Sequence, residues 1–505
     1  MKKKRFRTGV RLLCLLCAVL FSGCGIANKP NAGTTGTREE RTTEQSKEAK
    51  TDGEKKTEQK PSEEKPSEEV TTGKKEEVKP TVDIETVQAK SKSLIGKTDK
   101  DAIAYAVGEE ITFTIRLDAD GKTASCPKFK YVLNADDGRA QEEKLVDGKS
   151  GVLTLKTKLN VAGFVHLQVT VCDKDGNPID GVGKFDGGAA AGIADIRKKK
   201  AEPADFDAFW NSQLAKLDET APELMEIKEV KSPKAKYKVY AVKIKFGCEN
   251  NVHGDYVSGY LSVPENAKAE SLALYVTFQG YGVADQTIEC LSGRATLSVS
   301  PHSMEVGQPN WYYTQLEYGR LKDYGFRSDY NATRETVYFR EMLLRDVQAV
   351  RFLKKYFGAD GPDERFRGLW SEKKGLVLSG GSQGGFQAAA VTALEPGVTQ
   401  LLLYIPWMCD VGGCGTDGRQ KSTFMPEYTA ALEYYDTVNF AKRITCPVFI
   451  ESVGLGDYIA TPSGITSFYN NLTACPHKRI VFRQNTTHAG SLGNSQNFTL
   501  SQKNP

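Results

Sequence analysis

Residues 380–384 read Gly-Gly-Ser-Gln-Gly, a Gly-x-Ser-x-Gly pattern centred on Ser382, and another glycine, Gly385, follows. Such a pattern occurs by chance about 0.3 times in a chain of this length and composition, so its context must support it. The apolar stretch 375–379 in front of it and the helix-like stretch 386–394 behind it predict a strand, a turn and a helix. Glycines suit the tight turn of a nucleophile elbow, where larger side chains would clash. An ordinary glycine-rich loop is the alternative.

A serine hydroxyl becomes a useful nucleophile only when a base, commonly a histidine, takes its proton. In sheets with a nucleophile elbow the chain order is serine, then acid, then histidine. His488 follows the last apolar stretch, residues 480–482, and is therefore the predicted base. His477 precedes that stretch and is expected at the opposite edge of the sheet. The other three histidines precede the serine and are disfavoured: His166, His253 and His302.

The carboxylate that orients the histidine should follow the strand before it. Residues 448–452 form such an apolar stretch and lead into Asp457, which is the predicted acid. Asp410, after the stretch 401–405, is the alternative, but it would lie one strand too early.

The same chemistry needs two backbone N–H groups that face the developing oxyanion. Gln383, next after the serine, should supply one of them. The other should come from residues 279–282, which follow the predicted strand Ala273–Phe278, and Tyr281 is the predicted donor. This chemistry requires no metal and no organic cofactor. The cysteines show no close Cys/His pairing of the zinc-binding type, so no metal site is expected.

These residues belong to a long C-terminal part, residues 189–505, in which strand-like apolar stretches alternate with helical periods. That alternation is typical of an α/β fold, with a mainly parallel sheet wrapped by helices. One long helix is predicted over residues 335–356. The predicted strands are Ala273–Phe278, 375–379, 401–405, 448–452 and 480–482.

Residues 83–188 show a different, two-residue period, with Ile111 and Phe113 among apolar residues that alternate with polar ones. Half-buried strands and several Asp-Gly turns predict a small all-β domain, an immunoglobulin-like sandwich. His166 lies opposite the valines of its stretch and is predicted to be a surface residue. A joint rich in glycine and alanine is expected at residues 187–192.

The first 23 residues carry six basic residues and no acidic one, and an apolar run of ten residues, 12–21, follows the basic start. This run is too short to span a membrane and is typical of a signal peptide. The sequence Phe-Ser-Gly-Cys at its end resembles a bacterial lipoprotein signal, which predicts a lipid on Cys24. A plain secretory peptide is the alternative. Both predict an extracytoplasmic protein, and lipidation would anchor it to the membrane.

Residues 24–82 are dominated by Lys, Glu, Thr, Pro and Ser and are predicted to be a disordered linker. The whole chain has a formal charge of +4, which becomes −2 once the six basic residues of 1–23 are set aside. A nearly neutral body without a basic cluster gives no electrostatic basis for binding nucleic acid.

Several stretches together resemble the acetyl xylan esterase and cephalosporin C deacetylase family, carbohydrate esterase family seven, and in particular its two-domain relatives with an N-terminal β domain. The matching stretches are residues 202–210, 338–356, 380–385, 406–410 and 454–457, with Pro462 and His488. The resemblance implies an α/β-hydrolase domain, a triad of Ser382, Asp457 and His488, and an oxyanion hole of Tyr281 and Gln383. It also implies removal of acetyl groups from small acetylated sugars such as xylo-oligosaccharides.

Two positions depart from the family pattern. Residues 298–303, which include His302, stand where the family has Arg-Gly-Gln-Gly, and Gln279 stands where a histidine is frequent. The first departure bears on the substrate class more than on the chemistry, and backbone oxyanion donors tolerate the second.

Two other functions remain open. One is a different α/β-hydrolase, either a peptidase or a general esterase. The other is a tethered glycan-binding lipoprotein with a decayed hydrolase domain, which predicts a broken triad. The sequence also leaves open whether the chain forms a homo-oligomer. Cys409 and Cys414, the nearest couple of cysteines, could pair or could remain small buried residues.

Overall fold

The computed structural model describes residues 80–247, 253–415 and 418–503. The predicted signal segment, Cys24 and nearly all of the predicted linker 24–82 lie outside the described residues, so the lipid anchor and the linker stay predictions. Among the helices of the described ranges, none is both long and apolar enough to cross a membrane.

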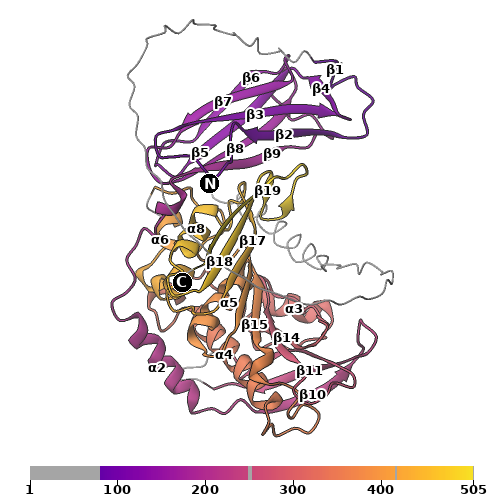
Figure 1. The fold of residues 1–505 in the computed structure, drawn as a ribbon, viewed down its shortest axis with the longest axis vertical. Coiled ribbons are helices and arrows are strands. Elements are labelled where there is room, and N and C mark those ends of the chain that lie inside the picture. The colour runs from indigo at the N-terminus through magenta and orange to yellow at the C-terminus, as the bar shows by residue number, and fades with distance from the viewer. Residues whose placement is uncertain (1–79, 248–252, 416–417, 504–505) are drawn as a thin grey trace, which may run out of the picture. The chain divides into compact units, whose positions relative to one another are not determined.

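The N-terminal described part is built from nine strands in two sheets (Figure 1). They are β1 (Val82–Asp83), β2 (Lys92–Thr98), β3 (Glu110–Ala119), β4 (Lys122–Ser125), β5 (Lys128–Ala135), β6 (Glu142–Asp147), β7 (Val152–Lys158), β8 (Gly163–Cys172) and β9 (Phe185–Ala191). One sheet has the order β1-β4-β3-β2, with β7 also paired to β3, and the other has the order β6-β5-β8-β9. We refer to these strands as the β unit.

The two-residue period of the sequence explains how the β unit forms its core. Ile111, Phe113, Ile115 and Leu117 on β3 are all fully buried, and the alternate residues Thr112 and Thr114 are not. The inward-facing residues of both sheets belong to one hydrophobic core. The β-rich domain is therefore as predicted, and its assignment as immunoglobulin-like stays a prediction.

Two expectations for the β unit are wrong. The stretch 187–192, expected to be a joint, lies mostly in strand β9, where small residues are needed because a Cβ on Gly187 would lie 2.0 Å from Gln484 Oε1. His166, expected on the surface, exposes only 11% of its side chain. Its Nε2 contacts the Asp186 carboxylate on the neighbouring strand β9, so a polar residue on this face of β8 has a partner within the protein.

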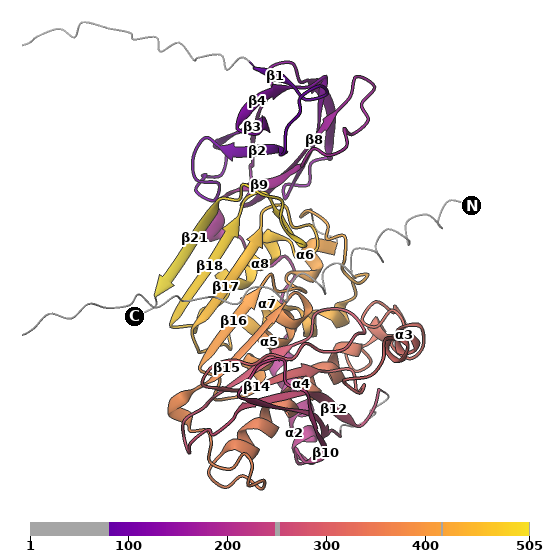
Figure 2. The same ribbon diagram turned by 90° about the vertical axis from the view of Figure 1, so that its right-hand side faces the viewer.

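The C-terminal part contains one ten-stranded sheet with helices packed on it (Figure 2). Its strands are β10 (Leu224–Val230), β11 (Tyr237–Lys245), β12 (Tyr256–Pro264), β13 (Ala273–Phe278), β14 (Arg294–Ser300), β15 (Leu376–Gly381), β16 (Gln400–Tyr404), β17 (Val448–Gly454), β18 (His477–Arg483) and β21 (Asn497–Lys503). Their order is β10-β11-β12-β14-β13-β15-β16-β17-β18-β21. Pairing from β14 to β18 is parallel, and the flanking pairs are antiparallel.

The helices of this part are mostly short. They are α2 (Phe206–Asp218), α3 (Asn310–Tyr318), α4 (Tyr338–Phe357), α5 (Gln383–Leu394), α6 (Val411–Gly415), α7 (Thr437–Ala441) and α8 (Pro462–Asn470). Helix α4 is the long helix predicted at 335–356, but it starts three residues later because residues 334–336 form a turn. Helix α4 packs against β11, β12, β13 and β14, and α5 packs against β13, β15 and β16. These contacts explain why most residues of both helices are buried.

The predicted strands agree with the observed ones to within a few residues. β13 has the predicted bounds, Ala273–Phe278, and β15 continues two residues further than predicted, to Gly381. His477 is the first residue of β18, so it lies at the opposite end of that strand from the segment that carries His488. The carboxyl ends of β15, β17 and β18 therefore lie on the same edge of the sheet, as their parallel pairing requires.

The glycines at the end of β15 give a prediction on stability. A Cβ on Gly380 would lie 2.1 Å from the Gly384 carbonyl oxygen, whereas a Cβ on Gly381 would meet nothing closer than Tyr404 Cβ at 3.6 Å. We expect Gly380→Ala to lower the free energy of unfolding by about 3 kcal/mol and Gly381→Ala by less than about 1 kcal/mol. Thermal unfolding of both variants measures the difference, and equal melting temperatures would contradict this account of the turn.

Candidate active site

Ser382 lies at a sharp turn between strand β15 and helix α5 (φ 54°, ψ −119°), a conformation that is unfavourable for a residue with a side chain. Backbone hydrogen bonds hold the turn. The Ser382 N–H donates to the Tyr404 carbonyl at 2.9 Å, and the Trp407 N–H donates to the Ser382 carbonyl at 3.0 Å. Gly384 allows the helix to start close to β13, since a Cβ there would lie 2.3 Å from the Phe278 carbonyl oxygen. The local geometry is that of a nucleophile elbow.

The structure brings the predicted serine, histidine and aspartate together. His488 Nε2 lies 3.0 Å from Ser382 Oγ, and His488 Nδ1 lies 2.8 Å from Asp457 Oδ2. The other carboxylate oxygen of Asp457 accepts hydrogen bonds from the backbone N–H groups of Ile459 and Ala460, at 2.8 and 3.0 Å. Asp457 and His488 are buried and Ser382 is half-buried. With this arrangement the imidazole can take the hydroxyl proton while the carboxylate holds the ring in place.

Two adjacent loops position these side chains. The acid loop, residues 455–461, follows β17, and the histidine loop, residues 484–489, follows β18. His488 lies in the turn between two short strands, β19 (Thr486–Thr487) and β20 (Gly490–Ser491). A backbone hydrogen bond joins the two loops, from the Gly456 N–H to the Thr486 carbonyl at 3.0 Å. A second bond joins the acid loop to the end of β18, from the Leu455 N–H to the Arg483 carbonyl at 2.9 Å.

The alternative acid, Asp410, has a different environment. Its carboxylate is fully buried, pairs with Arg419 Nε at 2.6 Å and accepts a hydrogen bond from the Lys199 N–H at 2.9 Å. Asp457, and not Asp410, is the carboxylate bonded to His488. The sequence argument that Asp410 lies one strand too early therefore selected the aspartate that contacts the histidine.

His302, which stands where the family pattern differs, lies deep in the protein. Its Nδ1 lies 2.7 Å from Tyr338 Oη. Burial, with smaller contributions from the nearby Arg320 and Arg345, lowers the pKa of His302 to about 3, so the ring is neutral near pH 7. A neutral ring avoids placing a third positive charge beside the two arginines.

Tyr324 is a residue of this site that the sequence analysis missed. Its hydroxyl accepts a hydrogen bond from the Gly282 N–H at 2.8 Å and donates one to Gln383 Oε1 at 3.1 Å. Its ring stacks on Tyr281, with centroids 4.5 Å apart and planes at 19°. Tyr324 therefore contacts both segments that were predicted to supply oxyanion donors. It lies in an irregular stretch without a motif, and nothing in the sequence distinguished it from the other tyrosines.

Burial also fixes the protonation state of this phenol. Tyr324 is 3% exposed, and burial, together with the neighbouring Tyr281, raises its pKa well above the usual value. The hydroxyl therefore keeps its proton and can donate to Gln383 Oε1 while it accepts from Gly282.

An aromatic cluster adjoins the serine. It consists of Tyr281, Phe326, Trp407 and Phe424, whose ring centroids all lie 4.7 to 6.1 Å from one another. The Trp407 indole N–H donates to the Phe424 carbonyl at 2.7 Å, which fixes the ring. The Trp407 N–H bonds to the Ser382 carbonyl, so the backbone of one member of this cluster is joined to the serine turn.

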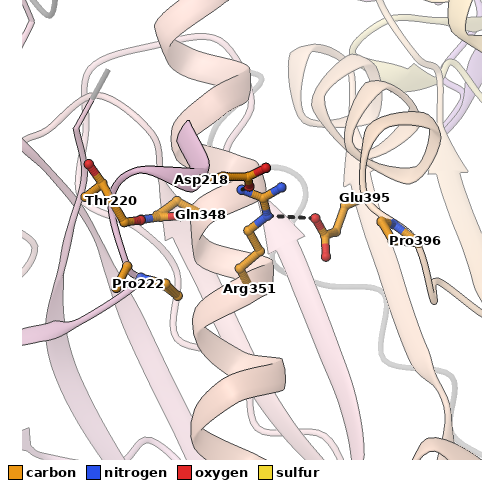
Figure 3. Close-up of a pocket in the computed structure, with 8 residues that line it drawn as sticks. Asp218, Thr220, Pro222, Gln348, Arg351, Glu395 and Pro396 are labelled. Atoms are coloured by element: carbon orange, nitrogen blue, oxygen red, sulfur yellow. Dashed lines mark hydrogen bonds and ion pairs between the residues drawn. The ribbon is translucent and has the colours of Figure 1, made fainter. Parts of the chain in front are cut away.

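The pocket drawn in Figure 3 is a separate feature with a volume of about 270 Å³. It lies where the end of α2 meets α4 and the end of α5, and it includes no residue of the Ser382 site. Arg351 lies between the carboxylates of Asp218 and Glu395, at 2.8 and 2.9 Å (Figure 3). Lys354 Nζ also pairs with Glu395, at 2.8 Å, so two cations balance two carboxylates, and we assign no ligand to this pocket.

The described ranges contain no group of three or more His, Cys, Asp or Glu side chains that could hold a metal ion. Cys409 and Cys414 are both free thiols, so the pairing that the sequence left open is not formed. The Cys414 thiol lies 3.1 Å from Thr461 Oγ1, and burial raises the pKa of both thiols, which act as small buried residues.

The strand order β11-β12-β14-β13-β15-β16-β17-β18, with serine after β15, aspartate after β17 and histidine after β18, defines an α/β-hydrolase-type fold. The described site therefore belongs to the class of α/β-hydrolases with a nucleophile elbow. More specifically, the chain belongs to the acetyl xylan esterase family (AXE1), whose profile matches residues 191–413 and 419–503.

One curated relative and two solved structures are similar to part of this chain. The acetyl esterase Axe7A of Xylanibacter ruminicola is 26% identical over 284 residues, which cover 54% of this chain and 61% of that protein. An acetyl xylan esterase from a Thermoanaerobacterium species has a TM-score of 0.45 at 21% identity, over 59% of this chain and 92% of the other. One from a Paenibacillus species has a TM-score of 0.44 at 18% identity, over 59% of this chain and 93% of the other.

The geometry around Ser382 gives a prediction that does not depend on the substrate. A fluorophosphonate should react with the Ser382 hydroxyl, and intact-protein mass spectrometry should find one added phosphonyl group. We expect no labelling of Ser382→Ala and labelling at least about 100-fold slower in His488→Ala, because the general base is lost.

Ser371→Ala is the matched control, since Ser371 is a half-buried serine in front of the short 3-10 helix η4 (Glu372–Lys374). It should be labelled like the wild type. Labelling of Ser382→Ala at the wild-type rate would show that another residue is the reactive one.

Proposed function

We propose that this protein is a serine esterase that removes acetyl groups from carbohydrates. The observation that carries the proposal is the continuous hydrogen-bonded series from Ser382 Oγ through His488 to Asp457. Membership of the acetyl xylan esterase family supports the acetyl ester as the bond that is broken.

The proposed reaction has two stages. Ser382 Oγ attacks the acetyl carbonyl carbon while His488 Nε2 takes the hydroxyl proton, and the tetrahedral intermediate collapses as His488 protonates the departing sugar oxygen. Water, deprotonated by His488, then attacks the acetyl-serine, and acetate leaves with regeneration of the Ser382 hydroxyl. Asp457 orients the imidazole and stabilises its positive charge. The backbone N–H groups of Tyr281 and Gln383 bind the oxyanion at both stages.

Small acetylated sugars, such as acetylated xylo-oligosaccharides, are the proposed substrates. The relative Axe7A is named an acetyl esterase, and two similar solved structures are named acetyl xylan esterases.

The proposed place of action is outside the cytoplasm, with the protein anchored to the cell membrane through a lipid on Cys24. The basic and apolar segment 1–23 that ends in Cys24 supports this location, and the polar segment 24–82 would give the enzyme reach from the membrane.

Acetate release tests the proposed function. Protein that starts at residue 80 should release acetate from 4-nitrophenyl acetate and from acetylated xylo-oligosaccharides, and activity should fall as the acyl chain lengthens from acetate to octanoate. We expect Ser382→Ala to be inactive and Asp457→Asn to lose about 10³ to 10⁴ in kcat, since the imidazole loses its orienting charge.

The rival functions predict other results. A decayed, glycan-binding protein would give wild type and Ser382→Ala the same absence of activity on every ester. A peptidase or a general esterase would give activity with no preference for acetylated sugars over other esters or amides.

Tyr324→Phe gives a second prediction for this reaction. The change keeps the ring that stacks on Tyr281 but removes the hydroxyl that joins Gly282 and Gln383. We expect kcat for acetate esters to fall about 10- to 100-fold with little change in KM, because the oxyanion donors lose their common support.

Tyr313→Phe is the matched control, since Tyr313 is a buried tyrosine whose hydroxyl donates to the Glu305 carbonyl at 3.0 Å and accepts from the Gln308 N–H at 3.2 Å. Its kcat should stay within about twofold of the wild type. Equal losses of kcat in both variants would attribute the effect of Tyr324→Phe to general packing.

A further inference from the structure

The histidine loop is bonded to the β unit through a buried side-chain amide. Gln484 Oε1 accepts a hydrogen bond from the Gly188 N–H at 2.8 Å, and Gln484 Nε2 donates to the Gly188 carbonyl at 2.9 Å. Gln484 is fully buried, so the oxygen and the nitrogen of its side-chain amide both need these hydrogen bonds in place of water. Gly188 belongs to β9, and the two residues are 296 positions apart in the chain.

The next residue makes a second connection to the same strand. Asn485 Oδ1 accepts a hydrogen bond from the Asp186 N–H at 3.0 Å, and Asn485 Nδ2 donates to the Gly493 carbonyl at 2.7 Å. Asn485 has φ 51°, in the left-handed region where asparagine is tolerated better than most residues. The chain therefore turns sharply just before His488 and is held at that turn by β9.

The acid loop packs against β9 as well. A Cβ on Gly456 would lie 2.5 Å from Asp186 Oδ1 and 2.6 Å from the Asp186 carbonyl oxygen, so only glycine fits there. A Cβ on Gly188 would lie 3.0 Å from the Leu455 carbonyl oxygen. Strand β9 thus contacts both loops that supply the base and the acid to Ser382.

We propose that the β unit is a positioning element of the active site, in which β9 fixes the acid and histidine loops and thereby the distances from His488 to Asp457 and to Ser382. The proposal rests on the proposed esterase function and assigns a role to the β unit beyond spacing or glycan binding. Gln484 and Asn485 are positioning residues, because their side chains bond to Gly188, Asp186 and Gly493 and hold the segment that bears His488.

The location of these contacts supports positioning over simple attachment. The β unit is also attached elsewhere, where Asp136 accepts a hydrogen bond from the Gln420 N–H at 2.9 Å. In the connecting segment, Asn470 Nδ2 donates to the carbonyls of Ile193 and Ile196, each at 2.9 Å. Those contacts involve neither loop of the site. Those contacts already attach the β unit, so the buried amides of Gln484 and Asn485 next to His488 point to an additional role.

Two variants and one matched control test the proposal. Gln484→Met keeps the approximate shape of the side chain but removes both hydrogen bonds to Gly188. Asn485→Gly removes the side chain and keeps the positive φ, which suits glycine. Asn470→Leu removes two hydrogen bonds of similar length away from the site, and it therefore controls for loss of stability.

Steady-state hydrolysis of 4-nitrophenyl acetate and the rate of fluorophosphonate labelling of Ser382 are the two measurements. We expect kcat and the labelling rate to fall about tenfold or more in Gln484→Met and Asn485→Gly, with KM within about twofold, because small displacements of a catalytic group lower the rate steeply. Asn470→Leu should keep both values within about twofold of the wild type even if its melting temperature falls as much.

The outcomes are distinguishable. If wild type hydrolyses the ester and all three variants lose activity equally, or none loses it, the positioning role is overturned while the esterase function stands. If wild type itself neither hydrolyses acetyl esters nor reacts with the fluorophosphonate, the proposed function fails and the inference fails with it. If one of the two variants does not fold, the other decides, since each removes a different contact to β9.

Discussion

The backbone turn at Ser382 is the constraint on which the rest of the site depends. A residue with a side chain at φ 54° and ψ −119° costs about 1 to 3 kcal/mol and persists only where the surroundings determine it. Here β15 leads into the turn, α5 leaves it, and the Tyr404 and Trp407 backbones bond to the serine on either side. The glycines around it are required because the chain returns so closely upon itself that a Cβ on Gly380 would overlap the Gly384 carbonyl group.

The partners of the serine are held by longer connections. The parallel order of β15, β16, β17 and β18 brings the ends of these strands to one edge of the sheet, and two adjacent loops there supply Asp457 and His488. Tyr324 joins the Gly282 and Gln383 segments on one side of the serine. Strand β9 supports the acid and histidine loops on the other. For Tyr324, Gln484 and Asn485 alike, a backbone N–H group of one segment bonds to a buried side chain of another. These bonds hold loops that are not part of a helix or a sheet.

A group of buried charges, Asp410, Arg419 and Asp136, lies outside the Ser382 site and connects parts of the fold. Asp410 and Arg419 form a fully buried ion pair that also lies near Asp136 of the β unit, with Arg419 Nη1 3.8 Å from the Asp136 carboxylate. Burial raises the pKa of Asp136, and Arg419 opposes that shift. Such groups contribute little net stability compared with apolar packing, but removing one partner leaves an uncompensated charge. The ion pair explains why an aspartate in a plausible place after β16 has no part in the Ser382 site.

The sequence by itself determined the fold class, the strands that form the centre of the sheet, and the serine, aspartate and histidine that meet in the structure. These are local properties, because a glycine pattern, an apolar period and a position in chain order can each be recognised within a few residues. Tyr324, residues 484–485, the continuation of β9 through the expected joint and the pairing of His166 with Asp186 were decided by the tertiary structure alone. Their contacts join residues from 20 to 299 positions apart in the chain. No local pattern around a tyrosine or a glutamine indicates such a distant partner. Local patterns specify which groups can react, whereas the long-range contacts decide how those groups are held.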